Sequence, residues 1–110
     1  MTPDRRRAAS SGRRAALRAR LETERGRRLD VAFEEAVAGL DARERAFARE
    51  LAYGVTRLRG RLDHLIALRL RRPPGSLDPE LLEALRLGAY QLLYMGGVPA
   101  YAAVSQAVEQ

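Results

Sequence analysis

The chain lacks two residue types on which many functional sites depend. It has no cysteine, which excludes disulfides, thiol nucleophiles and cysteine-ligated zinc. It also has no lysine, so the Gly-Lys element of a Walker phosphate-binding loop is absent. No apolar run approaches the roughly 20 residues that a transmembrane helix requires. No apolar segment follows the basic N-terminus, as it would in a secretory signal. We therefore expect a cytoplasmic protein.

Residues suited to acid–base or metal chemistry are equally scarce. The one histidine, His64, follows Asp63 on a predicted helix, and neighbours at i and i+1 do not face each other. None of the four serines lies in a Gly-x-Ser-x-Gly elbow. The acidic residues are scattered and are not spaced as in a calcium loop. The sequence predicts no catalytic residue, no metal site and no cofactor, and a chain that is not by itself an enzyme.

All 20 basic residues are arginines, and their distribution is uneven. Residues 1–28 carry ten arginines against three acids, a net charge of +7, whereas residues 29–110 have a net charge of −1. The planar guanidinium grips phosphate with two donors and stacks on bases. A basic N-terminal segment in front of a neutral body favours a polyanion-binding protein.

Two groups of arginines are candidates for RNA contacts. The first group consists of Arg5, Arg6, Arg7, Arg13, Arg14 and Arg18, and it can extend to Arg25, Arg27 and Arg28. The second group, in which acids are interleaved, consists of Arg57, Arg59 and Arg61. An arginine-rich segment that becomes ordered on contact is typical of RNA recognition. Arginines on helix faces can also be plain solvated surface, and this alternative stays open for both groups.

The N-terminal region predicts an arm followed by a helix. Residues 1–12 are polar and small, so we expect a disordered basic arm. A helical domain should follow over residues 13–110, with a first helix from near Ser11 to Gly26, a residue suited to the position after a helix end. The expected apolar stripe of this helix consists of Leu17 and Leu21.

Further helices are predicted at short intervals. Asp30 is placed to cap a second helix, and Asp41 followed by Glu44 resembles a capping box. Apolar residues then recur every three or four positions over residues 47–68, which indicates a sustained helical stripe. Because glycine weakens a helix, we expect two helices here, or one kinked near Gly60.

The C-terminal part predicts two more helices. Asp78 and Pro79 form a helix start, and a broad apolar face follows, which indicates the most buried helix. That face consists of Leu81, Leu82, Leu85, Ala89, Leu92 and Leu93. An amphipathic helix after Pro99 reaches Gln110 without a capping signal, so the fold is expected to be cut short. No segment alternates with period two, and we predict an all-α bundle of five to six helices.

Three segments resemble the NusB-fold family. They are residues 50–57 (ELAYGVTR) with residues 61–63 (RLD), residues 85–94 (LRLGAYQLLY), and residues 98–99 (VP) with residues 103–109 (AVSQAVE). The resemblance covers about residues 13–110. It is closest to the N-terminal NusB-like domain of RsmB, the 16S rRNA cytosine-5 methyltransferase. The family usually has Asn-Glu where this chain has Ser105-Gln106, and it continues with a last helix that this chain is expected to lack.

The resemblance implies three alternatives for function. The first is an RNA-binding domain that helps to position rRNA for a C-terminal methyltransferase domain that this chain lacks. The second is a free-standing NusB-like transcription antitermination factor that binds RNA and a ribosomal protein. In the third, the unfinished last helix leaves an apolar face exposed, and two chains cover it as a homodimer.

Overall fold

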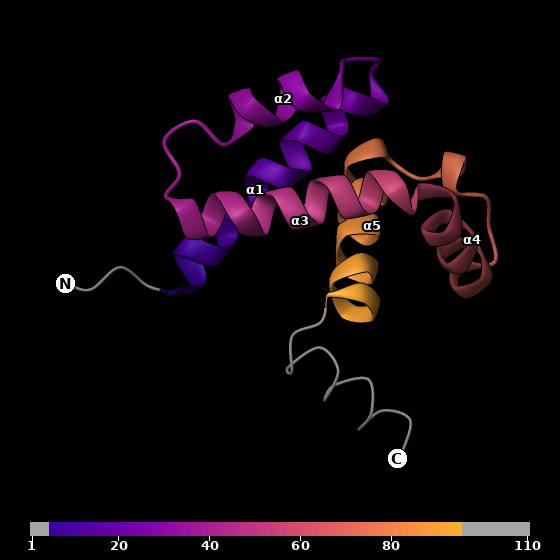
Figure 1. Cartoon of the computed structure of the whole chain (residues 1–110). Coiled ribbons are helices and arrows are strands. Elements are labelled where there is room, and N and C mark those ends of the chain that lie inside the picture. The colour runs from indigo at the N-terminus through magenta and orange to yellow at the C-terminus, as the bar shows by residue number, and fades with distance from the viewer. Residues whose placement is uncertain (1–4, 96–110) are drawn as a thin grey trace, which may run out of the picture. The chain divides into compact units, whose positions relative to one another are not determined.

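The structure is a computed structural model that describes the backbone of residues 5–95 and the side chains of residues 11–95. These residues form five α-helices and one short 3-10 helix, with no strand among them (Figure 1). The elements are α1 (Arg5–Glu24), α2 (Leu29–Ala36), α3 (Ala42–Arg57), α4 (Arg59–Leu70), η1 (Pro74–Ser76) and α5 (Pro79–Tyr94). The predicted all-α class is confirmed. The helix expected after Pro99 lies outside the described residues.

The chain divides into two compact units, Met1–Arg57 and Leu58–Gln110. In the first unit, α1 packs against both α2 and α3. A Cβ atom at Gly12 would lie 3.0 Å from the carbonyl oxygen of Glu44, and Arg20 donates a hydrogen bond to Thr56 over 2.8 Å. Gly12 and Glu44 lie toward the N-terminal ends of their helices, and Arg20 and Thr56 lie toward the C-terminal ends. The helices α1 and α3 therefore run in the same direction.

The face that α1 buries differs from the predicted one. Leu17 and Leu21, expected to form the apolar stripe, are only half-buried. The residues that α1 buries completely or nearly so are Gly12, Ala15, Ala16, Ala19 and Arg20. Small side chains let the backbones of two helices approach closely, and this geometry outweighs the larger transfer free energy of leucine.

The start of α1 also differs from the prediction. A helix was expected from near Ser11, behind a disordered arm, but the helix begins at Arg5. Residues 5–11 consist of arginine, alanine and serine and contain no helix breaker before Gly12. Arginine and alanine are among the best helix formers, so the helix extends back through these residues. Residue 12 is therefore not a helix boundary.

Helix ends follow the predicted signals, with one exception. Gly26 has a φ of +105°, and the amides of Gly26 and Arg27 donate to the carbonyls of Thr23 and Glu22, which is the Schellman motif. Asp41 accepts a hydrogen bond from the Glu44 amide over 2.9 Å, as a capping residue does. Asp30 does not cap α2, because the helix has already begun at Leu29.

The long apolar stripe is divided between two helices. The break between α3 and α4 falls at Leu58, two residues before Gly60. This confirms the expectation of two helices in this stretch. Leu51 and Val55 are completely buried on α3, as Leu62 is on α4, but the stripe fades toward its end, where Leu68 is 63% exposed.

In the second unit, α5 packs against α4. Asp78 caps α5 as predicted, and its carboxylate accepts from the amides of Glu80 and Leu81. The buried face is not the predicted one, because Leu92 and Leu93 are each about half exposed. The buried residues of α5 are Leu82, Glu83, Arg86, Leu87 and Tyr90. This face includes an ion pair, described below, which a purely apolar pattern does not reveal.

Candidate nucleic-acid interface

A row of arginines lies along the exposed side of α1. Arg14, Arg18 and Arg25 are four and seven residues apart, a spacing that puts them on one helix face, and all three are exposed. Arg14 and Arg18 have no ion-pair partner among the described residues. The guanidinium of Arg25 is 3.1 Å from Glu22. We call these three residues the α1 row.

The other predicted contacts of the first group either face another direction or have side chains outside the described residues. Arg13 is exposed, but it lies about 100° around the helix from Arg14 and so faces another direction. Arg5, Arg6 and Arg7 belong to the helical backbone of α1, whereas their side chains lie outside the described residues. The structure therefore brings Arg14 and Arg18 onto one face, together with Arg25, which the sequence offered only as an extension of the first group.

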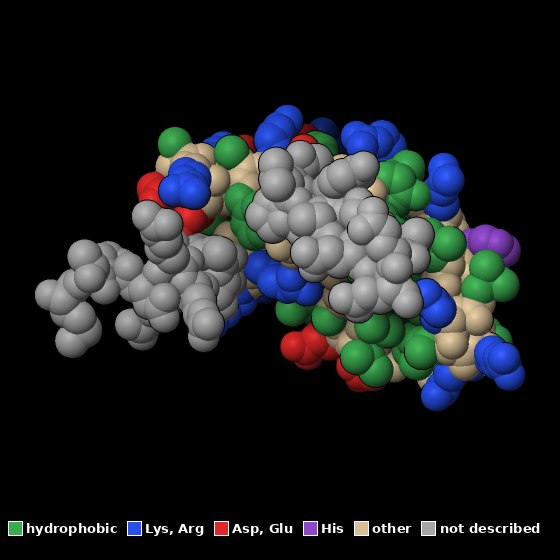
Figure 2. Space-filling view, turned by 90° about the horizontal axis from the view of Figure 1, so that it is seen from below, with side chains coloured by type: hydrophobic (Ala, Val, Ile, Leu, Met, Phe, Trp, Pro, Cys, Tyr) green, Lys and Arg blue, Asp and Glu red, His purple; other side chains and the backbone are tan. Residues whose placement is uncertain are grey.

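The second predicted group is divided between the two units. Arg57 ends α3 in the first unit, whereas Arg59 and Arg61 open α4 in the second. All three are exposed. The Arg61 guanidinium lies over the ring of Tyr94, 5.9 Å from its centroid. On the part of the face in Figure 2 that the grey atoms leave visible, arginine side chains lie among apolar ones.

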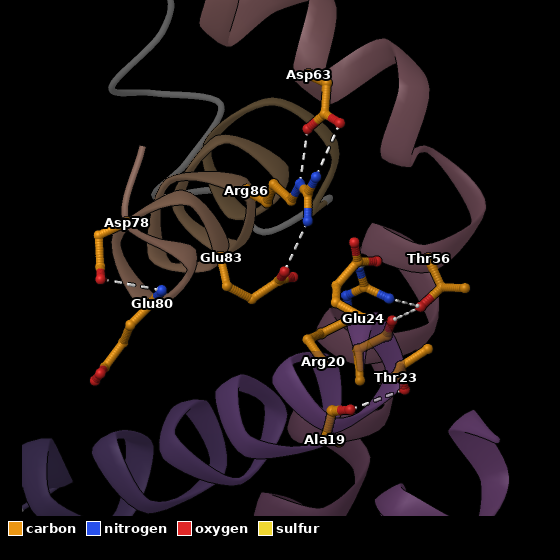
Figure 3. A network of polar contacts seen from close by, with 11 residues as sticks. Ala19, Arg20, Thr23, Glu24, Thr56, Asp63, Asp78, Glu80, Glu83 and Arg86 are labelled. Atoms are coloured by element: carbon orange, nitrogen blue, oxygen red, sulfur yellow. Dashed lines mark hydrogen bonds and ion pairs between the residues drawn. The ribbon is translucent and has the colours of Figure 1, made fainter. Parts of the chain in front are cut away.

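One arginine of the basic segment is not available for binding. Arg20 is fully buried, and it donates to Thr56 over 2.8 Å and to Glu24 over 2.7 Å (Figure 3). The Thr56 hydroxyl in turn donates to the Ala52 carbonyl. The one signal in the sequence is the i, i+4 spacing of Arg20 and Glu24, which many surface pairs share. Arg20 is a packing residue of the first unit.

A second arginine of the basic segment that is held by other side chains is Arg27, which the sequence offered only as an extension of the first group. The Schellman turn at Gly26 places Arg27 beside two carboxylates. Its two terminal nitrogens each donate to a different oxygen of Glu35 over 2.8 Å, and Glu22 lies 3.6 Å away. The hydrogen bond and the attraction of Arg27 lower the pKa of Glu35, and the same contacts raise the pKa of Arg27. This is a bidentate guanidinium–carboxylate pair at the surface.

A hollow opens between α1 and α2 beside this pair. Its volume is about 160 Å³. The residues that line it are Arg18, Glu22, Arg27, Ala32, Glu35 and Ala36. Arg18 belongs to the α1 row, so the row leads to the edge of the hollow. Two guanidinium groups and two carboxylates thus share one small concave surface.

Arginine also stacks on aromatic rings along α3. The Arg49 guanidinium is 4.5 Å from the centroid of Tyr53 and 5.8 Å from that of Phe33, and it is exposed. Phe33 itself is fully buried and meets Tyr53 edge to face, with centroids 5.5 Å apart. The arginine therefore covers the outer side of an aromatic pair that joins α2 to α3.

The second unit contains a buried ion-pair cluster. Arg86 donates to both oxygens of Asp63 over 2.7 and 2.9 Å, and to Glu83 over 2.8 Å (Figure 3). Burial would lower the pKa of Arg86, but its hydrogen bonds with Asp63 and Glu83 outweigh this effect and raise it. Asp63, considered above as a neighbour of His64, thus serves to join α4 to α5. His64 is exposed.

Within residues 5–95, no group of three or more His, Cys, Asp and Glu side chains is arranged to hold a metal ion. None of the described helices is long and apolar enough to cross a membrane.

Comparison with known proteins identifies relatives over most of the chain. Residues 4–110 match the family model described as the NusB family. A candidate methyltransferase of Mycobacterium tuberculosis is 53% identical over 72 residues, which are 66% of this chain and 16% of that protein. The ribosomal RNA small subunit methyltransferase B of Thermus thermophilus is 39% identical over 104 residues, 93% of this chain and 25% of that protein.

Another group of relatives is shorter. The transcription antitermination protein NusB of Shewanella halifaxensis is 37% identical over 76 residues, 69% of this chain and 54% of that protein. No solved structure matches the chain. The chain thus spans between 16% and 25% of the length of the methyltransferase relatives named here and about half the length of the NusB relative.

Proposed function

Because the chain belongs to the NusB family over residues 4–110, we propose that it is an RNA-binding domain whose main contacts come from α1. The family match is the observation that carries this proposal. The geometry of α1 supports it, since Arg14 and Arg18 are exposed on one face without ion-pair partners among the described residues. Guanidinium groups in that state are available to phosphate.

The proposed interface extends the α1 row at both ends. Arg5, Arg6, Arg7 and Arg13 add positive charge on the same helix, and Arg57, Arg59 and Arg61 form a secondary group. Contacts of this kind set the affinity and do not read sequence. The binding should therefore weaken steeply as the salt concentration rises.

The test is fluorescence anisotropy with a short single-stranded RNA over a salt series. Arg13, Arg14 and Arg18 are changed together to Ala, which should weaken binding about tenfold or more and lower the salt slope by about 2, at roughly 0.7 per lost phosphate contact. The matched control changes the exposed Arg43, Arg69 and Arg72 to Ala and removes the same charge. Equal losses in the two variants would contradict an α1 interface.

The finer proposal is that this RNA is rRNA and that the domain positions it for a methyltransferase domain. The methyltransferase relatives support this choice, because they are 39–53% identical to the chain. The antitermination relative is 37% identical. The chemistry of transfer would then belong to the other domain, and this chain would supply binding alone.

The alternative is an antitermination factor that binds RNA together with a ribosomal protein. The coding sequence around the gene and a pull-down experiment distinguish the two proposals. A methyltransferase domain encoded in the same or the neighbouring reading frame supports the first, whereas capture of a small ribosomal protein by the chain supports the second.

A homodimer is proposed as a separate property of the second unit. Four large apolar side chains of the described part of this unit are about half exposed or more, namely Leu68, Leu81, Leu92 and Leu93. Exposed apolar area of this kind is typical of protein interfaces. Sedimentation equilibrium tests it, and a monomer at all concentrations would contradict the dimer without bearing on RNA binding.

A further inference from the structure

We propose that the hollow between α1 and α2 is a phosphate subsite for the RNA backbone, in which a phosphate replaces Glu35 on the guanidinium of Arg27. The inference rests on the proposed RNA binding and adds a particular site and a competing carboxylate to it. The sequence offered Arg27 only as an extension of the first arginine group, and it did not single out Glu35. The hollow thus assigns a particular role to both residues.

The turn after α1 builds this subsite. The Arg27 amide donates to the Glu22 carbonyl over 3.1 Å as the last bond of the Schellman motif, and the positive φ of Gly26 makes that turn possible. The backbone of Arg27 is therefore held against the end of α1. On α2, Ala32, Glu35 and Ala36 are three and four residues apart and line one wall.

The bond between Arg27 and Glu35 is a template for a phosphate contact. Both guanidinium nitrogens donate to separate carboxylate oxygens over 2.8 Å. A phosphate presents two oxygens in nearly the same geometry, so the same fork of donors can hold either group. Glu35 occupies the position that an RNA phosphate would take.

Displacement of Glu35 is feasible because the pair is open to water. The side chain of Arg27 is 38% exposed and that of Glu35 is 59% exposed. Ion pairs with this exposure are weak, since water competes for both partners. A released Glu35 side chain would therefore be solvated by water.

The charge and size of the hollow also fit a phosphate. Arg18 lines it from the side of α1 and has no ion-pair partner among the described residues, so a second cation is available. Glu22 lines it too and opposes an anion, so it lowers the affinity of the subsite, and Glu35 competes with the phosphate for Arg27. The volume of about 160 Å³ is several times the roughly 30 Å³ that one water molecule occupies in the liquid.

The neighbouring residue on α2 supplies a matched control. Glu34 pairs with Arg45 over 2.7 Å, with side-chain exposures of 55% and 47%, and this pair does not line the hollow. The two ion pairs therefore involve adjacent glutamates of one helix with similar exposure. Only the Glu35 pair is next to the α1 row.

The experiment measures RNA affinity of the full chain by anisotropy over a salt series, for E35Q, E34Q, R27Q and R45Q. E35Q should tighten binding about threefold, because a negative charge beside the phosphate is removed. R27Q should weaken binding about threefold and lower the salt slope by about 0.7. The change in log affinity for E34Q should be less than half of that for E35Q, and the change for R45Q should be less than half of that for R27Q. Circular dichroism checks that all four variants are folded.

Each outcome decides one point. Equal effects of E35Q and E34Q would mean that overall charge alone matters, which overturns the subsite. RNA binding that depends on Arg13, Arg14 and Arg18 but not on Arg27 or Glu35 would overturn the subsite and leave the proposed function standing. No RNA binding at low salt by the unmodified chain would overturn both.

A second experiment distinguishes a site for the RNA backbone from a site for a free anion. Inorganic phosphate is titrated into the full chain while the Nε–Hε resonance of Arg27 is followed by NMR. A shift with phosphate, together with the affinity changes above, supports an RNA backbone site. A shift with phosphate and unchanged RNA affinity in R27Q and E35Q would identify a small-anion site and overturn the assignment to RNA.

Discussion

The position of a single arginine on α1 decides whether it packs or binds. Arg18 and Arg20 are two residues apart, yet Arg18 is exposed and Arg20 is fully buried between α1 and α3. Two residues along a helix turn the side chain by about 200°. The chemistry of the two guanidinium groups is the same, so the helical register alone separates their roles.

Replacing Arg20 by Ala should lower the free energy of unfolding by about 3 kcal/mol. The change removes packing volume and leaves Glu24 and Thr56 without their buried donor. Arg20→Met keeps most of the volume and should cost about 1 kcal/mol, because the Glu24 side chain that it leaves behind is 27% exposed and water can solvate its carboxylate. Urea denaturation measures both. Similar losses in the two variants would show that the hydrogen bonds, and not the volume, stabilise this site.

Replacing Gly12 by Ala should destabilise the chain by about 1–2 kcal/mol. The new Cβ would lie 3.0 Å from the backbone oxygen of Glu44 and 3.0 Å from a ring carbon of Phe47, and the backbone atom cannot easily move. Gly60→Ala is the control, because nothing lies within 4 Å of its Cβ position in α4. That variant should be stabilised by up to about 1 kcal/mol. Thermal unfolding of the pair tests the prediction, which a stabilised Gly12→Ala would contradict.

At the scale of the helix, the end signals are the most predictable features. Asp41, Asp78 and Gly26 act as the sequence predicts, because each effect depends only on residues within one turn. The buried faces of α1 and α5 were predicted wrongly. Each buried face is determined by contacts with another helix. Hydropathy alone predicts that leucines are buried, and it does not predict burial of the alanines of α1 or of the ion-paired Arg86 of α5.

Removal of the cap of α5 should have a measurable effect. Asp78→Ala leaves the amides of Glu80 and Leu81 without their acceptor, and we expect a loss of about 1 kcal/mol. Asp78→Ser retains an oxygen at this position and should restore most of the loss. Urea denaturation followed by circular dichroism provides the measurement. If the serine variant is as unstable as the alanine variant, the charge of Asp78 and not its capping hydrogen bonds stabilises α5.

At the scale of the whole molecule, the sequence predicts which segment of the chain carries the candidate site. It does not predict how the arginines of that segment are arranged in space. The excess of arginine before residue 29 is visible in the composition. Which of these arginines are held by other side chains depends on polar residues from other helices, as Glu35 shows for Arg27 and Thr56 for Arg20. Spacing along one helix does not contain that information.

Acidification should reduce the stability of the chain through Glu35. Its folded-state pKa lies below the ordinary 4.5 because of the hydrogen bond with Arg27 and the attraction between them. The pair therefore stabilises the fold fully above that ordinary value and ceases to do so as the pH falls through the folded pKa. Arg18 and Glu22 line the same hollow and modulate the effect. Urea midpoints measured from pH 6 to pH 3 should fall more for the unmodified chain than for E35Q. Parallel curves would contradict this.

The break at Leu58 has a consequence for binding that does not depend on how the two units are oriented. One non-helical residue separates α3 from α4, and Arg57 and Arg59 lie on either side of it. Covalent geometry keeps their Cα atoms within about 7.6 Å, two steps of 3.8 Å, in any arrangement. A polyanion held by one unit is thus presented to the other at a very high effective concentration, so that weak individual contacts combine as avidity.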